Sequence, residues 1–306
     1  MRVTTGVIND NFMRNLHNNM KRLDEYNQQL SSGKKFTRPS QNPIGVTTSM
    51  GMRNVINANE QYSRNVGMAR EWLYNTETVL INQGDILHRV KEQTVYAANE
   101  SLSQTDRDAI AGEIAELRDE MINLANTKIG DRYLMAGKTT KIADGEEVPF
   151  LIRDGDDHVT FNGDNEEIVR EIGAGIRIPI NINGEDNFAN TIDTLTALEK
   201  VIRTNEEVTV GDLTIENISD GMKVVDEMMD NNLRERAGLG ARTNRLELTA
   251  NRLDEEKLQA IELLSNNEDV DIADAITQLK MQEAVYRASL SIGARIMQPT
   301  LVDFLR

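Results

Sequence analysis

The spacing of apolar residues at the two ends of this chain most constrains its fold. Towards the C-terminus, between Asp269 and Leu305, residues recur at steps that alternate between four and three. The N-terminal segment has the same spacing, and a mean step of 3.5 residues is typical of a coiled-coil seam, which another helix must cover. The two ends therefore predict helices that pair with each other or with other subunits. The C-terminal positions are Ile272, Ile276, Leu279, Glu283, Tyr286, Leu290, Gly293 and Met297, and the N-terminal ones are Met13, Leu16, Met20, Leu23, Asn27 and Leu30.

The overall composition indicates that apolar residues lie in narrow helical stripes. Only 4% of the 306 residues are aromatic, and the mean hydropathy is −0.48. The formal net charge of −16 argues against nucleic acid or an anionic membrane as a partner. The acidic residues gather in the middle, because residues 139–190 hold four Lys and Arg against twelve Asp and Glu.

The sequence offers no cysteine, so disulfide and thiolate chemistry are excluded. The first residues have no apolar core of a cleavable signal peptide, and no run approaches the roughly 20 apolar residues of a membrane span. These features alone predict a cytoplasmic protein without membrane insertion, unless export uses an uncleaved route.

The order of elements predicts helices, then a β-rich insert, then helices again. Helices are expected at about 10–31, 43–98, 105–127, 189–203, 219–265 and 269–305, with Gly33 as a left-handed cap and Asn42 as the N-cap before Pro43. Short β-like runs broken by Gly and Asp occupy 133–183, namely 133–136, 148–152, 158–161 and 176–182. The expected fold class is mainly α, with both arms forming a coiled-coil or helical rod and a small α+β insert domain in the middle. The expected domains are 1–42 (assembly helix and linker), 43–138 (first half of the rod), 139–206 (outer insert), 207–266 (second half of the rod) and 267–306 (C-terminal assembly helix).

No constellation of catalytic residues is visible, which indicates that the protein is not an enzyme and needs no cofactor. The three histidines, His17, His88 and His158, fall on separate elements, and no P-loop, GxSxG, HExxH or dinucleotide fingerprint occurs. The acidic cluster Asp154–Asp157 lacks the spaced ligands and closing Glu of an EF-hand. A solvated acidic turn is the simpler interpretation of that cluster.

Five segments of the two arms carry a distinctive sequence. Two lie in the first arm, Leu30–Ile44 (LSSGKKFTRPSQNPI) and Gly130–Gly137 (GDRYLMAG). Three lie in the far arm, Arg236–Glu247 (RAGLGARTNRLE), Glu268–Ile276 (EDVDIADAI) and Leu301–Leu305 (LVDFL). Together they resemble the flagellin-like family, and within it the hook–filament junction proteins known as flagellar hook-associated protein 3, with Gly130–Gly137 similar to that family's step into its outer domain. The resemblance covers roughly 1–137 and 212–306.

This resemblance implies a structural subunit that self-assembles into a homo-oligomeric ring between hook-side and filament-side proteins. It implies export by the flagellar type III apparatus, with a cytoplasmic export chaperone and no signal cleavage, to an extracellular site on the bacterial flagellum. Its implied neighbours are another hook-associated protein and flagellin. Flagellin itself, the filament subunit, is the alternative, and a cytoplasmic coiled-coil adaptor is a third interpretation.

The seams suggest which residues would carry such assembly. Apolar side chains that no helix of the same arm covers would become buried on polymerisation, at roughly 25 cal/mol per Å² of apolar area. The alternative is that they are ordinary intramolecular core positions. The predicted assembly interface comprises Met13, Leu16, Met20, Leu23, Leu30, Ile272, Ile276, Leu279, Tyr286, Leu290 and Met297.

Overall fold

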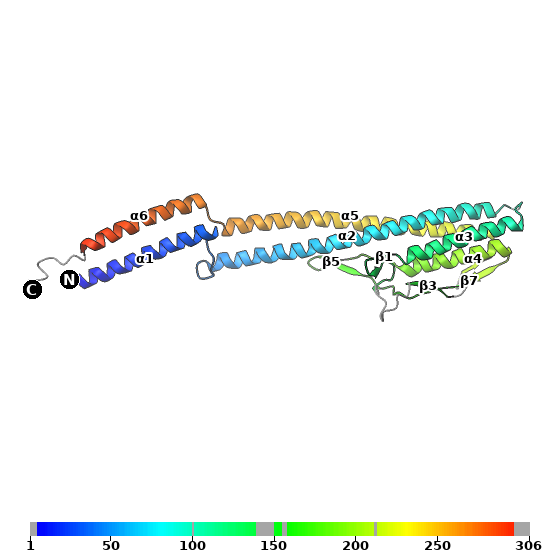
Figure 1. Ribbon diagram of the computed structural model, residues 1–306, viewed down its shortest axis with the longest axis horizontal. Coiled ribbons are helices and arrows are strands. Elements are labelled where there is room, and N and C mark those ends of the chain that lie inside the picture. Colours follow the sequence, from blue (N-terminus) through cyan, green and yellow to red (C-terminus); the bar gives the residue numbers. More distant parts are fainter. Residues whose placement is uncertain (1–4, 100, 139–149, 155–157, 211–212, 297–306) are drawn as a thin grey trace, which may run out of the picture. The chain divides into compact units, whose positions relative to one another are not determined.

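The computed structural model describes residues 5–99, 101–138, 150–154, 158–210 and 213–296, and its ribbon is dominated by long helices (Figure 1). The prediction of a mainly helical chain with a small mixed middle region is confirmed. The helices are α1 (Thr5–Ser32), α2 (Pro43–Ala97), α3 (Gln104–Ala125), the π-helix η1 (Glu185–Ala189), α4 (Asn190–Thr204), α5 (Ile218–Glu268) and α6 (Ile272–Ile296). The strands are β1 (Lys128–Ile129), β2 (Arg132–Tyr133), β3 (Leu151–Asp154), β4 (His158–Phe161), β5 (Val169–Gly173), β6 (Ile176–Pro179), β7 (Val208–Val210) and β8 (Leu213–Ile215).

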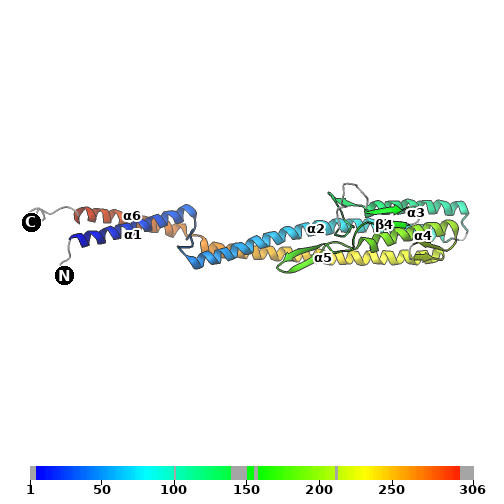
Figure 2. The same ribbon diagram turned by 90° about the horizontal axis from the view of Figure 1, so that it is seen from below.

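The chain divides into two compact units. Unit 1 contains residues 1–58 and 255–306, and unit 2 contains residues 59–254. The helices α2 and α5 each contribute to both units, whereas α1 and α6 belong wholly to unit 1. Figures 1 and 2, two views at right angles, both show α1 and α6 side by side along most of their lengths.

Local sequence signals explain where the helices of unit 1 begin and end. Gly33 has φ +70° and its N–H donates to the Gln29 carbonyl at 2.8 Å, which closes α1 with the expected left-handed cap. The side chain of Asn42 accepts from the Gly45 N–H at 2.9 Å, so it caps α2 as expected. Between them Phe36 is buried, and a β-carbon on Gly45 would lie 2.7 Å from the end of its ring. Glycine at position 45 thus lets the linker 33–42 lie against the first turn of α2.

Unit 2 packs its helices around a continuous apolar core. The largest fully buried side chains include Leu73, Leu80 and Leu87 of α2, Ile114 and Met121 of α3, and Phe188 of η1. The helix α3 begins with a full capping box between Ser103 and Asp106. The helix begins at Gln104, one residue before the start expected at about Thr105, because Ser103 supplies the capping hydroxyl. Trp72 is half-buried at the edge of this core.

The β-rich part of unit 2 consists of two-stranded antiparallel sheets, β1–β2, β3–β4, β5–β6 and β7–β8. The expected strand from Ile176 to Ile182 is shorter and ends at Pro179, although the next residue, Ile180, still donates its N–H to the Ile168 carbonyl at 2.9 Å. The buried Asn181 side chain then accepts from the Ile168 N–H and donates to the Glu166 carbonyl. Of the β-like run at 133–136, only Tyr133 lies in a strand, and the other three residues are buried without forming one. The expected run from Val148 lies partly outside the described residues.

A buried hydrogen-bond network links α2, α5 and η1 inside unit 2. Gln83 donates to the Asn187 carbonyl at 2.7 Å, and Asn232 donates both to the Gln83 side chain and to the Leu80 carbonyl at 2.9 Å. Gln83, Asn187 and Asn232 are each at most 4% exposed, and Asn187 takes part through its main-chain carbonyl. Because an unpaired buried amide is costly, the network favours one longitudinal register of these helices over others.

Candidate assembly surface

The helices α1 and α6 pack as an antiparallel pair along a heptad seam. In the heptad notation a to g, the a and d residues of each helix face the other helix, and all of them are buried or half-buried. These residues are Phe12, Leu16, Asn19, Leu23, Tyr26 and Leu30 of α1, and Ala275, Leu279, Gln282, Tyr286, Ser289 and Gly293 of α6.

Two contacts fix the register of this pair. The Asn19 amide donates to the Ser289 hydroxyl at 3.3 Å. Gly293 lies one turn after Ser289 in α6, and Phe12 lies two turns before Asn19 in α1. The two are so close that a β-carbon on Gly293 would lie 2.1 Å from Cζ of the Phe12 ring. The Phe12 ring therefore occupies the space that a side chain at position 293 would take, so the two helices approach closely there.

The structure divides the predicted interface into two groups. Five of its residues belong to the seam between α1 and α6, namely Leu16, Leu23, Leu30, Leu279 and Tyr286. The seam then continues through residues one position away from the expected ones: Ala275 rather than Ile276, Gln282 rather than Glu283, and Ser289 rather than Leu290. Small and polar seam residues carry a weaker apolar signal than their neighbours, which is why the sequence pattern pointed elsewhere. Phe12 and Tyr26 were missed, although each continues the seven-residue spacing of the d positions.

The other predicted residues remain exposed. Met13 and Met20 are 53% and 59% exposed, and Ile276 and Leu290 are 46% and 44% exposed. All four occupy e positions, and in an antiparallel pair the e positions of both helices lie on the same side of the seam. We call this set, Met13, Met20, Ile276 and Leu290, the e face. Ile272 is exposed at the start of α6, and Met297 lies outside the described residues.

At one end of the pair, the linker after α1 is joined to the turn between α5 and α6. The Lys35 N–H donates to the Glu268 carbonyl at 2.6 Å, and the Val270 N–H donates to the Gly33 carbonyl at 3.0 Å. These bonds form a short antiparallel β-bridge between Lys34 and Asp269. The Asn267 amide adds bonds to the Gly45 carbonyl and the Ser49 hydroxyl, both at 2.8 Å. The linker between α1 and α2 and the turn between α5 and α6 are thus hydrogen-bonded to each other at one place.

A nearly buried carboxylate lies at the centre of this junction. The Glu268 side chain is only 8% exposed and accepts from Lys34 Nζ at 2.6 Å and from Arg53 Nη2 at 2.8 Å. Burial alone would raise the pKa of the Glu268 carboxyl, but hydrogen bonds from Arg53, Lys34 and Ser49 outweigh it and lower the pKa from 4.5 to about 2. The ionised form is therefore strongly favoured when the junction is closed.

This low pKa predicts that the junction weakens in acid. Because the pKa of Glu268 is lower in the folded than in the unfolded chain, its stabilisation is complete above about pH 4.5 and is lost as the pH falls towards 2. Arg53 and Lys34 are 50% and 36% exposed, so solvent screening reduces the expected loss to on the order of 2 kcal/mol. Amide hydrogen exchange at Lys35 and Val270 measures it directly. In Glu268→Gln this pH dependence should vanish, whereas in the exposed control Glu262→Gln it should persist; an unchanged profile in Glu268→Gln would contradict the assignment.

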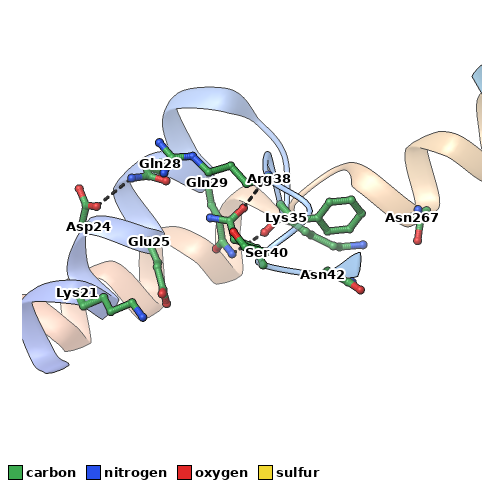
Figure 3. Close-up of a pocket in the computed structure, with 12 residues that line it drawn as sticks. Lys21, Asp24, Glu25, Gln28, Gln29, Lys35, Arg38, Ser40, Asn42 and Asn267 are labelled. Carbon is green, nitrogen blue, oxygen red and sulfur yellow. Dashed lines mark hydrogen bonds between the residues drawn. The ribbon is translucent and has the colours of Figure 1, made fainter. Parts of the chain in front are cut away.

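A polar cleft of about 700 Å³ lies beside this junction, between the last turns of α1 and the linker (Figure 3). Figure 3 shows the Gln28 amide donating to the Asp24 carboxylate and the Gln29 amide donating to the Lys35 carbonyl. Both glutamine amides thus have hydrogen-bond partners within the protein. The cleft contains no nucleophile–base pair of the kind that acyl or phosphoryl transfer needs.

The described ranges of the chain contain neither a metal-binding cluster nor a membrane-spanning helix. Within them, no three His, Cys, Asp or Glu side chains gather closely enough to hold a metal ion. No helix in the described part of the chain has the length and apolarity to cross a membrane. The acidic cluster Asp154–Asp157 lies largely outside the described residues.

Comparison with known proteins shows which family this chain belongs to. The model of the bacterial flagellin N-terminal helical region matches residues 3–140, and that of the flagellin C-terminal helical region matches residues 222–305. The two matches cover the arms that contain α1 and α6. The chain belongs to the flagellin-like family.

Curated relatives align along nearly the whole of this flagellin-like chain. Flagellar hook-associated protein 3 of Salmonella typhimurium is 29% identical over 94% of this chain and 95% of its own length, and that of Escherichia coli is 27% identical with the same coverage. Flagellin of Bacillus subtilis is 28% identical over 97% of both chains. These relatives are structural proteins of the flagellum.

Solved structures share the fold. A flagellar hook-associated protein from Vibrio parahaemolyticus matches with a TM-score of 0.63 and 19% identity, covering 75% of this chain and 100% of its own. The FlgL protein of Xanthomonas campestris matches with a TM-score of 0.52 and 18% identity, covering 62% of this chain and 92% of its own.

Proposed function

We propose that this flagellin-like protein is a structural subunit of the bacterial flagellum that forms the junction between hook and filament. The observation that carries the proposal is the e face: apolar side chains from both terminal helices stay exposed although the two helices already pair with each other. A monomer gains nothing from such a face, whereas assembly of copies through it would bury the face. Two relatives named hook-associated protein 3 align over almost the full chain.

Charge supports assembly through the terminal helices rather than through unit 2. Unit 2 holds 21 Lys and Arg against 38 Asp and Glu, a net charge of −17, whereas unit 1 is close to neutral with 13 against 12. Neighbouring copies would repel one another through unit 2. The proposed assembly segments are therefore 1–42 and 267–306, with 43–138 and 207–266 as the rod and 139–206 as its insert.

The proposed partners follow from the same role. They are further copies of this chain in a homo-oligomeric ring, a neighbouring hook-associated protein, and flagellin. We also propose that the chain reaches the cell exterior through the flagellar type III export apparatus, with a cytoplasmic chaperone and without signal cleavage. An enzymatic activity forms no part of this role.

The position and abundance of the protein in isolated flagella test this proposal. Immunogold labelling is expected to mark only the point where hook meets filament, and quantitative mass spectrometry should find it in small amounts relative to flagellin. The alternative, supported by the Bacillus subtilis flagellin match, is that the chain is itself a filament subunit. Label along the whole filament, in large excess over hook proteins, would establish that alternative instead. Protein found only in the cytoplasm would contradict both.

A further inference from the structure

The helix α6 carries a second exposed apolar strip on the side opposite the e face. Val285 and Ile292 occupy g positions and are 41% and 55% exposed, and Met281, one turn before Val285, is 51% exposed. We call Met281, Val285 and Ile292 the g strip. The g positions of α1 on the same side are polar: Asn15, Arg22 and Gln29. The g strip is therefore a single apolar row on one helix, whereas the e face combines rows from two helices.

These two surfaces differ in a way that makes them complementary. A row of side chains on one helix packs well between the rows of two neighbouring helices, as in any three-helix arrangement. Two e faces, or two g strips, would instead have to meet row against row. We propose that the g strip of one copy packs against the e face of a second copy of this chain. This inference rests on the proposed self-assembly and specifies how the copies meet.

Charges at the same level of the pair favour the same contact. Glu283 lies on the e side between Ile276 and Leu290, and its nearest cation in the described chain is Lys280 at 3.6 Å. On the g side, Arg22 forms no ion pair with any residue that the structure describes. The register set by Asn19 with Ser289 places Arg22 of α1 beside Val285 of α6, close to the level of Glu283. In copies placed side by side at equal height, Arg22 of one therefore reaches Glu283 of the next.

Such a contact has a defined consequence for assembly. Because each copy uses two different surfaces, the interface is heterologous, and repetition of it closes into a ring or continues as a helix. An isologous contact through the e face alone would stop at a dimer. The g strip is thus what allows a third copy to join two others.

The absence of cysteine from this chain allows a direct test by crosslinking. Full-length Met20→Cys and Val285→Cys proteins are mixed at high concentration and treated with a short bis-maleimide. We expect crosslinks between Cys-containing copies of the two kinds, identified by mass spectrometry, and few links within either kind alone. The matched control replaces Val285→Cys by Ala284→Cys, an exposed neighbour at an f position, and should give almost no links to Met20→Cys.

The outcomes separate this inference from the proposed function. Links between two Met20→Cys copies, in place of mixed links, would show self-assembly through an isologous contact and overturn the inference alone. No link between copies at any of these positions would overturn both. Charge reversal gives a second readout: Arg22→Glu should weaken self-association at least tenfold, and the double change Arg22→Glu with Glu283→Arg should restore most of it. Failure of the double variant to recover, with an intact helical spectrum, would also contradict the contact.

Discussion

The Leu290→Asp protein is expected to fold normally and to fail to self-assemble. Leu290 is 44% exposed at an e position, so a carboxylate there remains in water in the monomer and leaves the α1–α6 seam intact. In an assembly that buries the e face, the same change removes apolar area and buries an unpaired charge. Together these effects cost about 3 kcal/mol or more, which corresponds to at least a hundredfold loss in association.

Light scattering during size-exclusion chromatography measures this loss, and circular dichroism checks the fold. Ala284→Asp, on the same helix but at an outward f position, is the matched control and should assemble like the unchanged protein. The opposite result, normal assembly of Leu290→Asp together with Met20→Asp, would show that the e face is not an interface. General unfolding of Leu290→Asp would show that the residue has a role inside the monomer instead.

The Gly293→Leu protein is expected to open the α1–α6 pair. Even a single β-carbon at position 293 would lie within 3 Å of three atoms of the Phe12 ring, and a leucine side chain needs far more room. Overpacking of this kind costs about 1–3 kcal/mol, and a short antiparallel pair has little other stabilisation to offset it. Both terminal helices should then lose protection, while unit 2 retains its own core.

Limited proteolysis with mass spectrometry of the fragments tests this expectation. We expect Gly293→Leu to be trimmed rapidly at both ends to a resistant fragment, and the double variant with Phe12→Ala to resist better because the ring's space is freed. Gly67→Ala is the control, since nothing lies within 4 Å of a β-carbon there. Equal resistance of Gly293→Leu and the unchanged protein would mean that the pair does not depend on this contact.

Much of the secondary structure follows from local sequence signals alone. The cap at Gly33 and the Asn42–Pro43 helix start both lie where the sequence predicts them, because capping depends on residues only a few positions apart. The ends of the long helices α2 and α5 agree with expectation to within about three residues for the same reason. The alternating steps of three and four residues at both ends likewise predict two helices that each need a partner helix.

The tertiary structure decided which residues form the seam and which stay exposed. A one-residue shift places Gln282 and Ser289 in the contact and leaves Leu290 outside, because the close approach at Gly293 and the bond between Asn19 and Ser289 set the rotation of both helices. Apolar periodicity could not reveal this, since it scores the larger side chain as the buried one. The Glu268 junction could not be predicted from the sequence either, because its partners Lys34 and Arg53 lie more than 200 residues away in the chain. They meet Glu268 only when the α1–α2 linker packs against the turn between α5 and α6. Local chemistry thus determined the helices, and long-range packing determined their faces.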